Sequence, residues 1–164
     1  MSVNISLDEL LGYTDHERAK WRVWLGEDPS RLAVPFQPGG KFPTIGSLFD
    51  HVFLVERRHL SRLEGATPPD ASGVAPGDVT ALFEYADLVR ADLRAYLTAL
   101  SEADAASPME ISVTSGSYRM TRLTLSTHIL VHEMRHLAQI SYAARLAGLE
   151  PPGKHDFFYF REIR

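Results

Sequence analysis

The sequence predicts an all-α protein, an up-down four-helix bundle with a short β-hairpin before the last helix. Three observations support this fold class. Four segments repeat apolar residues at helical spacing, Pro and Gly residues cluster between those segments, and one short β-like stretch separates the last two. The chain has 164 residues, the size of one compact domain, so we expect a single domain over residues 1–164.

The first helix is predicted to begin at a capping box formed by Ser6 and Glu9. Gly12 interrupts it, and Thr14 and Glu17 form a second capping box, so we expect the helix to break near Gly12 and restart. Its apolar positions are Leu7, Leu10, Leu11, Trp21, Trp24 and Leu25. The two tryptophans are expected in the core.

Two further helices follow a loop over residues 29–43, which holds four prolines. The second helix is predicted from Thr44 to Leu63, with an apolar stripe at Ile45, Leu48, Val52 and Val55. A segment rich in Pro, Gly and Ala runs to Gly77, and Asp78 is expected to cap the third helix. The third helix carries the clearest amphipathic pattern, at Val79, Leu82, Phe83, Ala86, Val89, Leu93, Tyr96, Leu97 and Leu100.

Residues 110–121 have a different pattern. Ile111 and Val113 precede the turn-forming residues 114–117, and Tyr118 and Met120 follow them, which predicts a short β-hairpin. Thr121 is then expected to cap a long fourth helix. That helix should end near Gly148, because glycine favours the conformation that terminates helices.

Composition excludes several classes of site. The chain has no cysteine, so a transition metal would have to bind imidazole and carboxylate groups. The formal charge of −4 gives no drive toward nucleic acid. No apolar run is long enough to span a bilayer, and the first residues lack the pattern of a signal peptide. We therefore expect a cytoplasmic protein without a nucleic-acid or membrane partner. Its apolar content of 45% favours a homodimer.

The fourth helix carries a histidine motif. His132 and His136 are four residues apart, so they share one helix face and can converge on one metal ion. His128 extends the same row. A third ligand should come from a facing helix, and His51 is the candidate because Leu48, Leu54 and Val55 place it at the border of a buried face. Three neutral imidazoles suit Zn²⁺ or Ni²⁺ and leave a coordination position open.

Residues 132–136 also fit the HExxH pattern of zinc peptidases, in which the glutamate is a general base and a third ligand follows downstream. Glu150, His155 or Asp156 would be that ligand. Glu133 is the candidate catalytic residue in this hypothesis, and it could instead orient an imidazole or be solvated beside a ligand. Two other nearby roles stay open, those of Glu56 and Gln139, although a surface amide is the favoured interpretation of Gln139. His16, His59 and His155 are expected at the surface.

Two motifs resemble the DinB-like family of metal-binding bundles, a superfamily that includes YfiT-type putative hydrolases and thiol-dependent transferases. They are residues 50–56, Asp-His-Val-Phe-Leu-Val-Glu, and residues 132–140, His-Glu-Met-Arg-His-Leu-Ala-Gln-Ile. The tail over residues 146–157 is also similar. Such families often carry His-His-Arg-Gly-Gln at the end of the late motif, whereas this chain has Arg-His-Leu-Ala-Gln at residues 135–139.

The resemblance implies a metal triad made of one histidine from the second helix and the spaced pair from the last. Those positions are His51, His132 and His136 in this sequence. It also implies a metal-dependent transferase, with a low-molecular-weight thiol as cosubstrate, or a hydrolase acting on a small molecule. Two alternatives remain, a non-catalytic metal-binding or stress-response protein and the HExxH peptidase.

Overall fold

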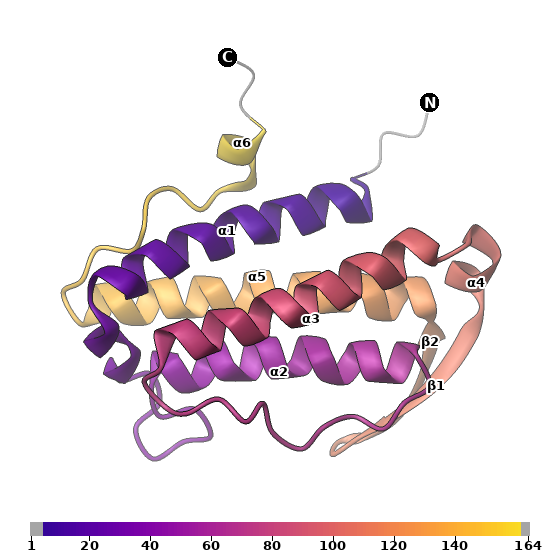
Figure 1. Ribbon diagram of the computed structural model, residues 1–164, viewed down its shortest axis with the longest axis horizontal. Helices are drawn as coiled ribbons and strands as arrows, with labels where there is room; N and C mark the ends of the chain where they lie inside the picture. The colour runs from indigo at the N-terminus through magenta and orange to yellow at the C-terminus, as the bar shows by residue number, and fades with distance from the viewer. Residues whose placement is uncertain (1–4, 162–164) are drawn as a thin grey trace.

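The computed structural model describes residues 5–161 of the chain and consists mainly of helices (Figure 1). In order, the elements are α1 (Leu7–Glu27), the 3₁₀ helix η1 (Pro29–Ala33), α2 (Ile45–Leu63), α3 (Val79–Ala99), α4 (Glu102–Ala106), β1 (Pro108–Val113), β2 (Gly116–Thr121), α5 (Arg122–Leu146) and α6 (Phe157–Phe160). The predicted all-α bundle with a hairpin before the last long helix is confirmed.

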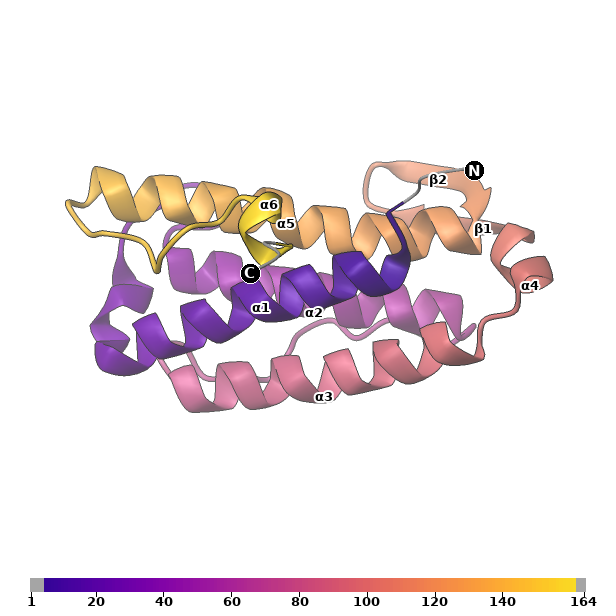
Figure 2. The same cartoon turned by 90° about the horizontal axis from the view of Figure 1, so that it is seen from above.

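Four long helices, α1, α2, α3 and α5, lie side by side along the long axis of the molecule (Figure 2). Each of α1 and α2 packs against both α3 and α5. Contacts between α2 and α3 advance in the same direction along both helices, since Phe53 contacts Phe83 and Arg57 pairs with Asp92. The two helices are therefore parallel, so the predicted up-down order is wrong for this pair, and the connecting segment of residues 64–78 crosses back along the bundle (Figure 1).

The first helix is continuous, so the predicted break near Gly12 is wrong. The Ser6–Glu9 capping box forms as expected and opens α1. Thr14, by contrast, does not start a new helix, because its hydroxyl donates a hydrogen bond to the Leu11 carbonyl within the helix. One glycine costs a helix only about 1 kcal/mol, and burial of the Leu11 side chain on the core side offsets that cost.

The other predicted boundaries agree closely with the structure. Thr44, Asp78 and Thr121 cap α2, α3 and α5 through their side-chain oxygens. The hairpin pairs β1 and β2 in antiparallel register, with Ile111 opposite Tyr118. α5 ends two residues before Gly148, which has a φ of 76°. The short helices η1, α4 and α6 were not predicted, because elements of four or five residues are too short to show a periodic pattern.

The apolar core has two parts. One contains both tryptophans, as predicted, with Phe49, Phe53 and Phe83. The other gathers leucine and isoleucine side chains from the opposite half of the bundle beneath the hairpin. No helix among residues 5–161 combines the length and the hydropathy required to span a membrane.

Candidate metal centre

Three histidines converge between α2 and α5. His51 comes from α2, and His132 and His136 come from successive turns of α5. Among residues 5–161, these three are the group of potential ligands close enough to hold one ion, and the candidate ligand atoms lie within 4.8 Å of one another. The Nε2 atoms of His132 and His136 are 3.1 Å apart. We call these three residues the imidazole trio.

The trio suits a divalent ion in chemistry and in spacing. Imidazole nitrogens bind Zn²⁺ at about 2.0–2.1 Å, which places tetrahedral ligands about 3.3 Å from one another. The ring centroids of His51 lie 5.1 Å from those of both His132 and His136, so small ring rotations would bring its nitrogen to that spacing. Three nitrogen ligands without a thiolate favour ions such as Zn²⁺ or Ni²⁺.

The environment keeps the imidazoles neutral. Burial lowers the pKa of His51 to about 4, helped by His136, Lys41, Arg58 and Arg135. Burial also lowers the pKa of His132 to about 2, and the neighbouring histidines add to this shift. A neutral imidazole retains the lone pair that a metal ion requires. The trio is therefore ready to bind an ion without first losing protons near neutral pH.

Gln139 orients one of the three rings. Its Oε1 lies 2.5 Å from Nδ1 of His136. An amide oxygen can only accept, so this nitrogen carries the proton and donates a hydrogen bond to the oxygen. The lone pair of Nε2 then faces the other two imidazoles. Supporting hydrogen bonds of this kind fix the tautomer of metal-ligating histidines. The favoured interpretation of Gln139 as a surface amide was wrong, although its spacing from His136 already placed both on one helix face.

Two further histidines extend the row away from the trio. The ring of His128 lies 5.7 Å from that of His132 and 5.3 Å from that of His59. His59 is only 8% exposed, so the prediction that it lies at the surface was wrong. Its position on α2 faces α5, because His51 and His59 are about two helical turns apart.

Glu133 points away from the trio, into the centre of the bundle. Its carboxylate accepts hydrogen bonds from Arg18 Nε at 2.6 Å and from Arg90 Nη2 at 2.5 Å. Glu56 also pairs with both arginines. These four residues, one from each long helix, form the ion network. Burial raises the pKa of Glu133, but the two guanidinium groups outweigh it and hold the pKa below its ordinary value. This pairing is typical of a structural ion pair, and it directs the carboxylate away from the trio.

The downstream ligands of the peptidase hypothesis lie elsewhere. The ring of His155 stacks on Trp21 with ring centroids 5.4 Å apart, and its Nδ1 forms a hydrogen bond with the Glu17 carboxylate. The backbone carbonyl of Glu150 accepts a hydrogen bond from Trp24 Nε1. Neither residue, nor Asp156, belongs to the ligand group described above. The expected surface position of His155 is also inaccurate, because its ring is partly buried.

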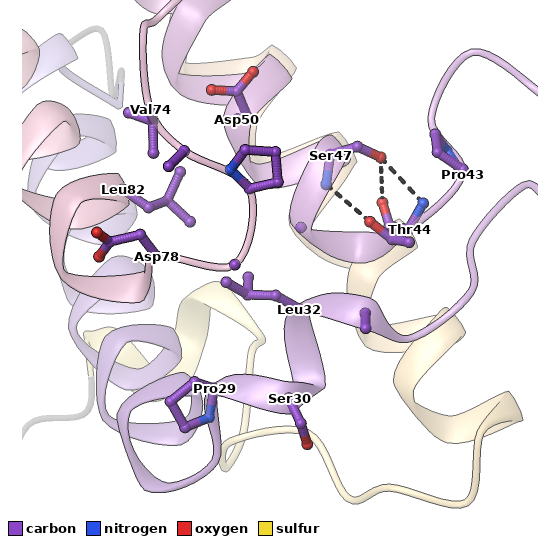
Figure 3. A pocket seen from close by; sticks show the side chains of 15 residues that line it. Pro29, Ser30, Leu32, Pro43, Thr44, Ser47, Asp50, Val74, Asp78 and Leu82 are labelled. Atoms are coloured by element: carbon purple, nitrogen blue, oxygen red, sulfur yellow. Dashed lines mark hydrogen bonds between the residues drawn. The ribbon is translucent and has the colours of Figure 1, made fainter.

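Open space adjoins the trio. His51 and His59 line a hollow of about 700 Å³ between α2, the segment of residues 65–70 and the hairpin, which we call the cationic hollow because Lys41, Arg58 and Arg62 also line it. A second hollow of about 730 Å³ lies near the N-terminus of α2 (Figure 3). Mostly small and apolar residues line this second hollow. Its Asp50 accepts a hydrogen bond from the Ser72 hydroxyl. Of these two hollows, only the cationic hollow is lined by a member of the trio, His51.

Comparison with known families identifies the chain. The model of the DinB superfamily matches residues 13–140, more than half of the sequence. The chain belongs to the DinB superfamily. The matched region contains all three members of the trio in this DinB protein, as the resemblance of its motifs implied, and it stops before the tail over residues 146–157. None of the curated proteins compared with the chain matches it.

Proposed function

We propose that this DinB protein binds one divalent metal ion through the imidazole trio and acts as a metal-dependent transferase or hydrolase on a small molecule. One observation carries the proposal. Three neutral imidazoles converge beside an open hollow, and no fourth protein ligand joins them among residues 5–161. Three protein ligands with an open position are the pattern of catalytic rather than structural zinc sites.

An ion held by the trio would supply Lewis-acid chemistry, lowering the pKa of a ligating water or thiol toward neutrality. The chain supplies the remaining parts. Gln139 fixes the ring of His136, and the ion network holds α5 in register with the other three helices. A low-molecular-weight thiol is the proposed cosubstrate of the transferase, and Zn²⁺ or Ni²⁺ the proposed ion. The proposed compartment is the cytoplasm.

The non-catalytic alternative differs in one measurable property. A structural metal site is closed by protein ligands, whereas a catalytic one exchanges a ligand with solvent. Protein purified without a nickel column should contain about one equivalent of metal per chain. After replacement by Co²⁺, the visible spectrum should change when a small thiol is added, because the thiol enters the open position.

A Co²⁺ spectrum that no thiol or small anion perturbs would favour the structural alternative and would contradict the proposed catalytic function. His128→Ala is a matched control for these measurements, because His128 lies in the same row on α5 but outside the trio. This variant should keep both the metal content and the spectral response to thiol.

A further inference from the structure

One stripe of α2 links the metal ligand to two arginines. His51, Val55, Arg58 and Arg62 follow one another at helical spacing, and all four line the cationic hollow. At a rise of 1.5 Å per residue, Arg58 lies about 10 Å along the helix from His51, and Arg62 lies about 16 Å from it. The hollow therefore extends from the trio to a pair of guanidinium groups.

These arginines have no acidic partner among the residues that the structure describes. Arg58 donates from Nε to the Pro69 carbonyl at 2.8 Å and from Nη2 to the Asp70 carbonyl, which leaves Nη1 for a ligand. Within residues 5–161, the one polar side-chain contact of the Arg62 guanidinium is with His59, whose Nδ1 lies 3.5 Å from Nη1. Arg57, one residue away on a different face, pairs with Asp92 at 2.8 Å. In the described part of the chain, the two arginines of the hollow thus differ from Arg57 in lacking a counterion.

Their charges also act on each other. Burial and the adjacent Arg58 lower the pKa of Arg62. Lys41 adds a third positive charge to the lining, and its ammonium lies over the ring of Phe42. The two carboxylates of the lining, Asp70 and Glu110, are exposed and form no ion pair with these cations in the part of the chain described. An uncompensated group of like charges in a partly enclosed hollow favours binding of an anion.

We propose that the cationic hollow binds the oxyanion, a carboxylate or phosphate, of an elongated substrate or thiol cosubstrate whose other end reaches the metal at His51. The proposal rests on the proposed metal-dependent function. Guanidinium groups suit carboxylate and phosphate because their donors form a planar fork. Arg58 is held by two backbone carbonyls, so its remaining donors are already oriented when the ligand enters. The ligand would span about 10 Å between its reacting atom and its charge, the axial distance from His51 to Arg58.

Matched thiols on the Co²⁺-loaded protein test this directly. Mercaptohexanoate, mercaptopentyl phosphate and neutral mercaptohexanol have similar lengths, and their affinities can be measured from the change in the Co²⁺ spectrum. We expect at least one charged thiol to bind about tenfold more tightly than the alcohol, the effect of one charge-assisted hydrogen bond. Comparison of the two charged thiols distinguishes a carboxylate site from a phosphate site.

Arg58→Gln and Arg62→Gln should each reduce this preference for the charged thiol by about fivefold or more. Arg57→Gln is the control and should leave it unchanged, because Arg57 pairs with Asp92 outside the hollow. Arg58 also holds residues 69 and 70, so Arg62→Gln gives the answer if Arg58→Gln disturbs that segment. Equal binding of charged and neutral thiols by the wild type would overturn the proposal.

A metal-free experiment separates this proposal from the metal function. Pyrophosphate is titrated into the metal-free protein at low ionic strength by calorimetry. Saturable binding that Arg62→Gln weakens about fivefold, and Arg57→Gln does not, supports the anion site even if Co²⁺ fails to bind. Failure of Co²⁺ binding would contradict the proposed function alone, whereas absent or Arg62-independent pyrophosphate binding would contradict the anion site alone.

Discussion

At the scale of single residues, neighbouring positions on α5 serve opposite sides of one helix. His132 belongs to the trio, while the next residue, Glu133, belongs to the ion network and has an exposed fraction of 1%. Successive residues of a helix differ by about 100° in direction, so both placements follow from helical geometry. The same geometry explains how an HExxH pattern occurs here with its glutamate turned away from the candidate metal position.

Gln139 is expected to control metal affinity without touching the metal. Gln139→Leu removes the oxygen that accepts the proton of His136 Nδ1, so the ring loses its fixed tautomer. The affinity for Zn²⁺ should fall at least about tenfold, as is usual when such supporting groups are lost. Competition with a coloured chelator measures it. Gln139→Glu keeps an acceptor and should retain most of the affinity; equal affinities of all three proteins would rule out the orienting role.

Glu133→Gln tests whether this residue is structural or catalytic. The substitution leaves Arg18 and Arg90 short of one negative charge in the centre of the bundle. Removing one partner of a buried ion pair destabilises a protein by about 3–5 kcal/mol, and urea unfolding would detect this loss. We expect folded Glu133→Gln to retain one metal equivalent. Unchanged stability together with loss of a metal-dependent reaction would instead support the general-base role.

The spacing of residues in the sequence predicted part of the candidate metal centre but not the groups that surround it. The interval between His132 and His136 fixes one face of one helix, and the apolar neighbours of His51 indicated a buried border. Arg18 and Glu133 are 115 positions apart, so their contact depends on how the helices pack and leaves no local pattern. The spacing of Gln139 from His136 also placed it on the same helix face. An amide side chain occurs both at protein surfaces and beside binding sites, so its chemistry did not decide between the two.

At the scale of elements, the close approach of η1 to α2 limits one position of the second helix. A Cβ added at Gly46 would lie 2.8 Å from the Leu32 carbonyl oxygen, nearer than packed atoms allow. Gly46 is in the first turn of α2, the helix that carries His51. The packing of η1 against α2 therefore requires glycine at this position.

Gly46→Ala should destabilise the protein by about 1–3 kcal/mol, the usual cost of overpacking. Gly26→Ala is the matched control, because Gly26 also lies in a helix and a Cβ there meets nothing within 4 Å. That variant should be unchanged or more stable by up to about 1 kcal/mol, owing to the higher helix propensity of alanine. Thermal unfolding of both variants compares them. Equal effects of the two substitutions would show that the contact with η1 is unimportant.

Element boundaries were predictable where side chains cap helices, as Thr44 and Thr121 do. The predicted break near Gly12 was wrong because the pattern of Thr14 and Glu17 resembles a helix start, whereas burial along one face keeps α1 continuous. The parallel run of α2 and α3 depends on the path of residues 64–78, whose Pro-rich sequence predicts a loop but not its direction. Local chemistry thus located the helices, and long-range packing determined their arrangement.

At the scale of the whole molecule, buried neutral histidines link stability to pH. Burial lowers the pKa of His59 from 6.5 to about 4, and that of His51 falls to a similar value. Between these values the unfolded chain binds more protons than the folded one. The free energy of unfolding of the metal-free protein should therefore fall as pH decreases from 6.5 to 4.

Urea unfolding of the metal-free protein at several pH values measures this dependence. His59→Gln replaces a titrating ring with a neutral amide, so its stability should decrease less steeply over the same range. His16→Gln is the control, since His16 is exposed, and should follow the wild type. A slope in His59→Gln as steep as that of the wild type would show that this histidine does not contribute.

The homodimer inferred from apolar content stays a prediction. Tyr142 and Leu146 on α5 are 64% and 72% exposed, so apolar surface is available for a second copy. Sedimentation should give a mass near twice the 18.3 kDa of one chain. A species of single-chain mass at every concentration would exclude the dimer.

Zinc titration of the metal-free protein tests the imidazole trio most directly. We predict that His51→Ala weakens Zn²⁺ binding by at least about tenfold, because its ring faces both histidines of α5. His155→Ala should stay within about a factor of two of the wild type, since its ring is bonded to Glu17 and stacked on Trp21. The opposite result, in which His155→Ala empties the site and His51→Ala does not, would contradict the proposed centre.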